Sequence, residues 1–163
     1  MKKFCISLMI CSIFFSCQQS PNSKNQRTFN TEPKVDTSYI AIIPYHEKNE
    51  ARKATNLTST DLVDIDSILV DFSKDYNSHI SKSLSNSEDK KNYLINLRDY
   101  KRQYTPTKNI NGEKEVIVYC MCDVSNVDWK HESKIVRDGG KCYFTLTINL
   151  TTKKYNIYMN GGA

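Results

Sequence analysis

Three cysteines in the second half of the sequence are the residues best suited to covalent or metal chemistry. Cys120 and Cys122 are separated by one residue, and Cys142 follows after a connection of nineteen residues. Thiols in this arrangement could form a disulfide, remain reduced in a core, or bind a metal ion together with His131. Structural zinc sites usually leave about two to four residues between paired cysteines. The spacing therefore favours a disulfide over a metal site.

The strands expected around these cysteines indicate which two of them pair. Residues 115–122 and 142–150 both show the alternating, β-branched pattern of strands, and we expect them to be antiparallel neighbours. Cys122 would then lie opposite Cys142 at the end of the ladder. This favours a Cys122–Cys142 bridge, with Cys120–Cys142 as the alternative. A closed loop of about twenty residues could contribute ~3 kcal/mol.

A second candidate site combines cations with aromatic rings in a short stretch of the chain. Its members are Tyr93, Arg98, Tyr100, Lys101, Arg102 and Tyr104. Surfaces that bind carbohydrates or anionic polymers often combine these residue types. Lysine and arginine on an exposed edge strand would also protect that edge from pairing, without any ligand. Both interpretations stay open, and the group is the predicted binding surface.

The histidines show none of the arrangements that are typical of enzymes. His46, His79 and His131 are scattered, without a helix-spaced partner or an adjacent nucleophile. The sequence also has no glycine-rich phosphate loop and no nucleophile elbow. An enzyme would need a site assembled from distant residues, such as His131, Asp138 and a carboxylate on a helix. We therefore predict no cofactor, no metal ion and no catalytic residue.

The charge balance limits the class of partner. The 163 residues contain 23 Lys+Arg and 18 Asp+Glu, a net charge of +5 that falls to +3 if Lys2 and Lys3 are removed with a leader. Nucleic-acid binding requires a clustered basic face, and so small a net charge gives no indication of one. We predict no nucleic-acid partner.

The strongest periodicity in the sequence predicts a long amphipathic helix. Thr58 or Ser59 would be its N-cap, and Asp61 lies in the first turn, where the helix dipole favours a carboxylate. From Asn77 to Asn92 serine, asparagine and lysine dominate, so we expect the helix to end there in a loop. Its apolar stripe comprises Leu62, Ile65, Leu69, Phe72 and Tyr76. A second stripe, which could be a docking face, a calcium site or a solvated surface, comprises Asp61, Asp64, Asp71 and Asp75.

The remaining patterns predict a sheet. Strands are expected over residues 38–44, 101–106, 115–122, 142–150 and 155–159. Asn111-Gly112 predicts a hairpin, and Pro106 would place its strand at an edge or a bulge. The fold class is α+β, with one long N-terminal helix on a curved antiparallel sheet of about four to five strands, a layout that resembles cystatin-like folds. The core set on the strands comprises Val116, Val118, Phe144, Leu146, Ile148 and Ile157.

The first residues have the pattern of an export signal. Met1-Lys2-Lys3 is positive, and residues 4–15 form an apolar run of twelve. As a helix this run would span only ~18 Å, well short of a hydrocarbon core of ~30 Å. We therefore predict that residues 1–16 are a signal peptide and not a permanent membrane span.

The end of this run, Phe14-Phe15-Ser16-Cys17, resembles the lipobox of bacterial lipoproteins in the relaxed form found in the Bacteroidota. The resemblance implies that Cys17 becomes the lipid-modified, palmitate-carrying first residue of the mature chain. Several acyl chains would hold the protein at the membrane almost permanently. Phe14 and Phe15 depart from the usual leucine and small residue. Ordinary cleavage nearby, with Cys17 an unmodified thiol, is the alternative.

Further resemblance to small Bacteroidota lipoproteins lies in Tyr100–Tyr104, Gly112–Val116, Cys120–Cys122 and Asp138–Phe144. It implies an architecture and carries over no activity or catalytic residue. Residues 17–37 would be the lipidated cysteine and a polar, flexible tether, and residues 38–163 a single domain. Gln18 follows the cysteine, and the absence of an early acidic residue resembles lipoproteins on the periplasmic face of an outer membrane.

These features together predict a cell-envelope lipoprotein, attached to the membrane through its lipid. We expect its domain to be a non-enzymatic binding or inhibitor module for a protein or a glycan. An envelope hydrolase with an assembled site is the alternative.

Overall fold

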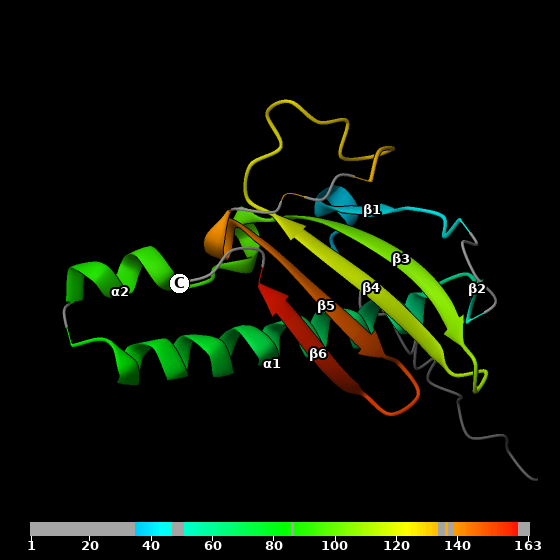
Figure 1. Cartoon of the computed structure of the whole chain (residues 1–163), viewed down its shortest axis with the longest axis horizontal. Coiled ribbons are helices and arrows are strands. Elements are labelled where there is room, and N and C mark those ends of the chain that lie inside the picture. Colours follow the sequence, from blue (N-terminus) through cyan, green and yellow to red (C-terminus); the bar gives the residue numbers. More distant parts are fainter. Residues whose placement is uncertain (1–34, 47–50, 86, 134–135, 137–138, 160–163) are drawn as a thin grey trace, which may run out of the picture. The chain divides into compact units, whose positions relative to one another are not determined.

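The computed structural model describes residues 35–46, 51–85, 87–133, 136 and 139–159. Within them the chain has an α+β fold, in which one long helix packs on one face of a six-stranded mixed sheet (Figure 1). These elements belong to one compact unit. Cys17 and the expected signal peptide lie outside the described residues.

Helix α1 (Ser59–Ser83) begins where its capping signals predict. Thr58 is the N-cap: its hydroxyl accepts the backbone N–H of Asp61 at 3.2 Å, and its own N–H donates to Asp61 Oδ2 at 2.7 Å. This reciprocal pair is a capping box, which satisfies two otherwise unpaired N–H groups. The prediction of the N-terminus is therefore confirmed.

Helix α1 ends within the expected segment, residues 77–92, but most of that segment is helical and not a loop. Helix α1 continues to Ser83, and a second helix, α2 (Ser87–Tyr93), follows almost at once. The serines and asparagines from Asn77 onward are weak helix formers, but the stretch contains neither glycine nor proline to end a helix. A segment expected to be a loop is therefore helical.

Four strands pair in chain order as antiparallel neighbours: β3 (Lys101–Asn109), β4 (Lys114–Met121), β5 (Tyr143–Asn149) and β6 (Lys154–Met159). Two short strands flank β3 on its other side. Of these, β1 (Ile40–Ile42) is parallel to β3 and β2 (Arg52–Ala54) is antiparallel to it. The sheet is therefore mixed and has six strands, not the four to five expected. The helix is not N-terminal either, because α1 follows β1 and β2.

Pro106 lies inside the sheet, contrary to the expected edge or bulge. On one side Pro106 pairs with Val116 of β4. On the other side, the pairing of β3 with β1 ends at Tyr104 and its pairing with β2 begins at Thr107. Pro106 lies between these two paired stretches. The carbonyl of Tyr104 accepts Ile43 N–H at 2.9 Å, so alternate residues of β3 turn their backbone groups towards these short strands. The missing N–H of Pro106 therefore faces the break between them.

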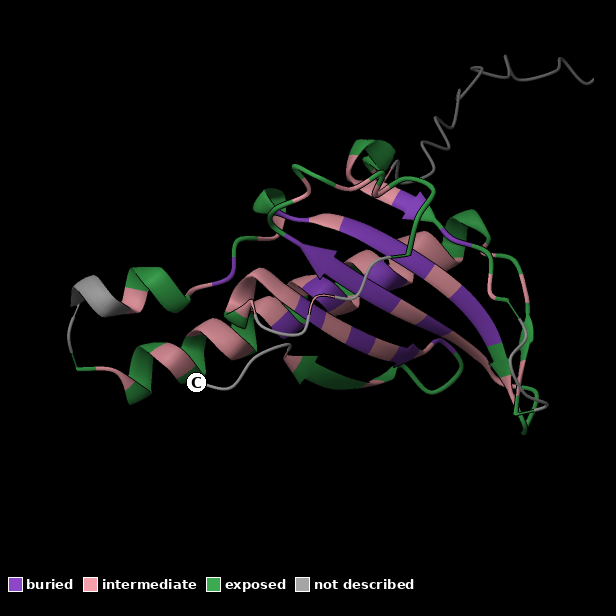
Figure 2. Cartoon of the chain, turned by 45° about the horizontal axis from the view of Figure 1, so that its top comes forward, coloured by how far each residue is buried: buried purple, intermediate pink, exposed green. Residues whose placement is uncertain are grey.

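The main core lies between α1 and the sheet (Figure 2). The predicted stripe and strand set supply most of it, and Phe72 of α1 contacts Phe144 with ring centroids 5.5 Å apart. Ile157 is the exception, because it shares this face but remains 40% exposed on the edge strand β6. Tyr155 and Met159 of the same strand pack against the core instead.

Candidate functional site

The sheet has a second face, which α1 does not cover and which we call the open face. Tyr104 of β3 and Val118 of β4 point into the core. Their neighbours in the same strands, Gln103 and Tyr119, therefore point to the opposite side of the sheet. The alternation continues through β5 and β6. The open face includes Gln103, Thr105, Ile117, Tyr119, Tyr143, Thr145 and Tyr158.

A hollow of about 440 Å³ lies on the open face. Among the described residues, none of those that line it is charged. Tyr158, at its edge, is 70% exposed. The lining combines rings and methyl groups with hydroxyl and amide groups: Gln103, Thr105, Ile117, Tyr119, Ser133, Thr145 and Tyr158. Such a lining suits a neutral ligand that is apolar on one side and rich in hydrogen-bonding groups on the other.

The connection between β4 and β5 runs beside this hollow and is bound to the sheet by its backbone. The amide of Gln103 donates to two carbonyls of the connection, those of Trp129 and Glu132, each at 2.6 Å. The hydroxyl of Tyr119 accepts Val136 N–H at 2.9 Å. Gln103 is only 2% exposed, so its hydrogen bonds are shielded from water. These contacts make the connection one wall of the open-face hollow.

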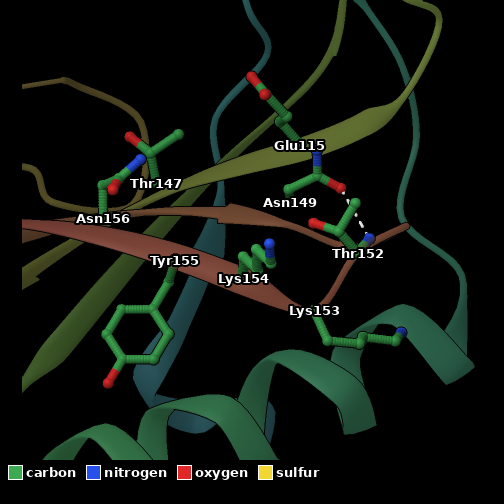
Figure 3. A pocket seen from close by; sticks show the side chains of 8 residues that line it. All are labelled: Glu115, Thr147, Asn149, Thr152, Lys153, Lys154, Tyr155 and Asn156. Carbon is green, nitrogen blue, oxygen red and sulfur yellow. Dashed lines mark hydrogen bonds between the residues drawn. The ribbon is translucent and has the colours of Figure 1, made fainter.

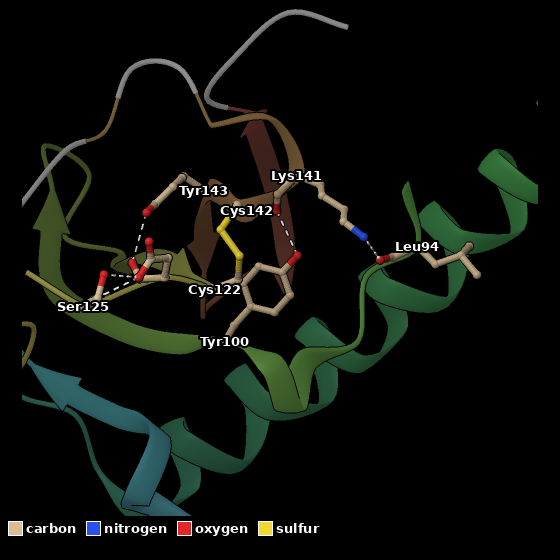
Figure 4. Close-up of a disulfide and its surroundings, with 8 residues drawn as sticks. Leu94, Tyr100, Cys122, Ser125, Lys141, Cys142 and Tyr143 are labelled. Carbon is tan, nitrogen blue, oxygen red and sulfur yellow. Dashed lines mark hydrogen bonds between the residues drawn. A yellow bond between two sulfur atoms is a disulfide. The ribbon is translucent and has the colours of Figure 1, made fainter. Parts of the chain in front are cut away.

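A disulfide closes the base of the same connection (Figure 4). Cys122 and Cys142 are bridged, with Cα atoms 5.0 Å apart, and Cys122 N–H donates to the carbonyl of Cys142 at 2.9 Å. This is the pairing that the expected strand register favours. Tyr143, next to the bridge, donates from its hydroxyl to the carbonyl of Asp123 at 3.1 Å and stacks on Tyr119. Cys120 remains a free, buried thiol.

The predicted aromatic and basic surface does not exist as one surface. Tyr100, Arg102 and Tyr104 are 2%, 7% and 0% exposed, and all three lie on the helix side of the sheet. Burial raises the pKa of both tyrosines well above the ordinary value. Tyr93 is 46% exposed on α2, and the Nζ atom of Lys101 lies 4.0 Å from the ring centre of Tyr39.

Arg102 and Tyr100 are held inside the fold by specific contacts. The carboxylate of Asp66 on α1 pairs with Arg102 at 3.3 Å, and the hydroxyl of Tyr100 donates to the carbonyl of Lys141 at 2.9 Å. Tyr100 and Arg102 therefore belong to the packing between the sheet and the elements around it. Of the predicted binding surface, Tyr93 and Arg98 are exposed.

The structure does not assemble the catalytic group considered from the sequence. His131 is exposed in the β4–β5 connection, and its Nδ1 lies 2.9 Å from Asp128 of the same segment. That hydrogen bond lowers the pKa of Asp128. Gln103 binds the adjacent backbone from the open face, whereas the carboxylates of α1 lie beyond the opposite face. Asp138 lies outside the described residues.

The acidic stripe of α1 is partly used in ion pairs. Asp61 pairs with Lys114 of β4 at 2.7 Å, and Asp64 pairs with Lys153 of the β5–β6 turn. Among the described residues, no group of three histidine, cysteine, aspartate or glutamate side chains is arranged to hold a metal ion. Within the same residues, no helix has the length and hydropathy needed to cross a bilayer.

A larger hollow of about 610 Å³ lies at the β5–β6 turn and is less suited to a ligand (Figure 3). Its lining includes Tyr155, which shares the helix side of β6, and Asn156, which shares the open face. Lys153 extends towards α1 and pairs with Asp64. The hollow therefore follows both sides of an edge strand and has no single wall of converging groups.

No protein-family model, no curated protein and no solved structure matches the chain. The open face is therefore the candidate site on its geometry alone. Sequence reasoning missed it because Thr145 and Tyr158 have the pattern of an ordinary solvated face. The usable signal was that the alternate residues Thr105, Tyr119 and Thr145 are uncharged in a chain in which one residue in four is charged.

Proposed function

We propose that the domain is a non-enzymatic binding module whose open face binds a neutral glycan. The observation that carries this proposal is the open-face hollow, in which tyrosine rings, threonine hydroxyls and the Gln103 amide meet without a charged side chain among the described residues. The described lining therefore offers no counter-ion to an ionic ligand. It suits sugar rings, which present an apolar face and a rim of hydroxyl groups.

Individual residues of the hollow can be given roles in this proposal. Tyr158 is exposed on the edge strand, so its ring is free to stack on a sugar. Thr105 and Thr145 lie on the open face, where their hydroxyl groups can donate and accept. Gln103 already donates to two carbonyls and acts as the support of the wall rather than as a ligand contact.

The proposal is tested by titrating the full-length protein in detergent with maltohexaose, xylohexaose and N-acetylchitohexaose, following Trp129 fluorescence. We expect at least one of these neutral glycans to bind. Loss of one stacking contact in Tyr158→Ala should weaken that binding about fivefold to tenfold. Tyr93→Ala, a matched change at an exposed tyrosine of α2, should leave it unchanged. If none of the glycans binds, or if both variants lose binding equally, the glycan proposal fails.

We further propose that the chain is exported and anchored through lipid on Cys17 to the periplasmic face of an outer membrane. The support is the sequence of residues 1–17, with its positive start, short apolar run and Ser16-Cys17 boundary. Metabolic labelling with palmitate should mark the protein and be lost in Cys17→Ala. Cys11→Ala, a cysteine change inside the apolar run, should keep the label. An unlabelled protein that washes off membranes without detergent would contradict the anchor.

The resemblance to cystatin-like folds is also a proposal. It is supported by one long helix that packs on a sheet in which β3 to β6 are consecutive antiparallel strands. The parallel strand β1 and the second helix α2 are additions to that layout.

A further inference from the structure

A third hollow, of about 520 Å³, lies on the helix side of the sheet, away from the open face. It forms where α1, the 3-10 turn Leu97–Asp99 and residues 36–39 meet, and Arg102 contributes to its lining from β3. We call it the Arg102 hollow. Its volume is in the range that takes a small metabolite.

The guanidinium of Arg102 has fewer hydrogen-bond acceptors than a buried cation needs. Its side chain is 9% exposed, and in the described part of the chain its one ionic partner is Asp66, with NH1 and Oδ1 3.3 Å apart. Its Nε is buried without a hydrogen-bond partner. A guanidinium carries five N–H donors, and a buried charge is costly unless it is paired and hydrogen-bonded. An anionic group in the hollow would place a second counter-charge beside this guanidinium, which has Asp66 as its one described ionic partner.

The other charged residues of the Arg102 hollow show that a simple anion is not the best match. Arg98 is exposed at the hollow and forms no ion pair with any described residue. Asp36 and Asp66 also line it, and each uses only Oδ1 in the hydrogen bonds of the described residues. The described lining of the hollow thus contains two cations and two anions. A ligand of one sign would meet repulsion as well as attraction, whereas a ligand with both charges would satisfy both.

The rest of the described lining includes the polar residues Ser73 and Asn96 and an apolar part. Val70 of α1 and Leu97 of the 3-10 turn, together with the ring of Tyr39, form a wall that a hydrocarbon side chain could contact. The small size, the paired charges and this wall describe one chemical class of ligand.

We propose that the Arg102 hollow binds a free α-amino acid with an apolar side chain, its carboxylate towards Arg102 and Arg98 and its ammonium group towards Asp36 and Asp66. The planar guanidinium suits a carboxylate, which it can hold with two parallel hydrogen bonds. This site is separate from the open face, so it does not depend on the proposed glycan binding.

The test is isothermal titration of the full-length protein in detergent with L-alanine, L-valine, L-leucine and L-phenylalanine. We expect at least one to bind. Its N-acetyl derivative, which lacks the ammonium charge, and its methyl ester, which lacks the carboxylate, should each bind about 10-fold to 100-fold more weakly. Inorganic phosphate serves as the anion control. Binding of none of the four amino acids, or equal binding of phosphate and the amino acid, would overturn the proposal.

Two variants locate the binding without disturbing the core. Arg98→Gln changes an exposed cation, and Asp36→Asn keeps the side-chain oxygen that caps Ser38 N–H at 2.9 Å. Each should weaken amino-acid binding about tenfold or more. The matched controls are Lys74→Gln and Asp71→Asn, which remove an exposed ion pair of α1 outside the hollow. Equal effects of test and control variants would contradict the proposed site. Tyr158→Ala should leave amino-acid binding intact, which separates this proposal from the glycan one.

Discussion

Lys114 Nζ lies 2.7 Å from Oδ2 of Asp61, so the start of β4 is joined to the first turn of α1. The same oxygen accepts the N–H of Thr58 in the capping box, also at 2.7 Å. The Asp61 side chain is 14% exposed. One carboxylate therefore both caps the helix and fixes it to the sheet, which explains why the helix begins at this point over the hairpin end of β4.

We predict that Asp61→Asn lowers the free energy of unfolding and makes it less sensitive to acidic pH. Burial, the largest single influence on Asp61, raises its pKa, but the hydrogen bonds from Lys114 and Thr58 outweigh it and the net shift is downward. A lowered pKa in the folded state gives stability that is present above the ordinary value of 3.8 and is lost as the pH falls through the folded-state pKa. Removal of the charge should cost about 1–2 kcal/mol at pH 7.

Urea unfolding of both proteins at pH 7 and at several pH values below 4 measures this effect. Asp64→Asn is the control, because Asp64 also pairs with a lysine, Lys153, but has no part in the capping box. Its pair is more exposed, so its loss should be smaller. An equal loss in the two variants would show that the capping role adds nothing.

The disulfide should stabilise the domain by restricting the unfolded chain. Cys122 and Cys142 are 20 residues apart in sequence. Replacement of both by serine should lower the free energy of unfolding by up to about 3 kcal/mol in the loop-entropy model. Dithiothreitol should lower the stability of the wild-type protein by a similar amount and leave the double variant unchanged. A wild-type unfolding curve that does not respond to the reductant would refute this.

The free thiol of Cys120 should be chemically silent in the folded protein. Burial raises its pKa to about 12, so the reactive thiolate is scarce at pH 8. Iodoacetamide should therefore label the Cys120 peptide only after unfolding in guanidinium. Cys122, which is exposed, should be labelled readily once the disulfide is reduced. Rapid labelling of Cys120 under native conditions would mean that the core around this thiol opens easily.

The elements that could be predicted from the sequence are those with local signals. The capping residues around Thr58, the apolar stripe that includes Leu69 and the alternation around Leu146 each determine their own segment. The side of the sheet to which Arg102 and Tyr104 point could not be predicted from such local signals. Their side of β3 depends on packing against α1, and a short aromatic and basic segment looks the same whether it lies at a surface or in a core.

The candidate site was missed for a related reason. The open-face hollow has walls from four strands and from the β4–β5 connection, which Gln103 and Tyr119 hold through the backbone. The residue types do not indicate this role, because glutamine and tyrosine also occur on solvated strand faces. The sequence indicated the disulfide that closes the connection, because cysteine pairing depends on strand ends that the pattern locates.

Asn77 should matter more than its polar surroundings in α1 suggest. Its amide donates to the carbonyl of Ile95 and accepts Ile95 N–H, each at 2.8 Å, so one side chain satisfies both backbone groups of a buried residue. Asn77→Ala would leave these groups unpaired and should cost about 1–3 kcal/mol. Asn77→Asp keeps the acceptor but turns a second oxygen towards the Ile95 carbonyl, so it should be no better than alanine at neutral pH.

Urea unfolding, together with hydrogen exchange of the Ile95 amide, checks this prediction. Exchange at Ile95 should become faster in both Asn77 variants, because its N–H loses an acceptor or the segment that carries it is displaced. Ser78→Ala, at the next and exposed position of α1, is the matched control and should change neither the stability nor the exchange rate. If Asn77→Ala unfolds like the wild type and Ile95 stays protected, α1 does not hold this segment through Asn77.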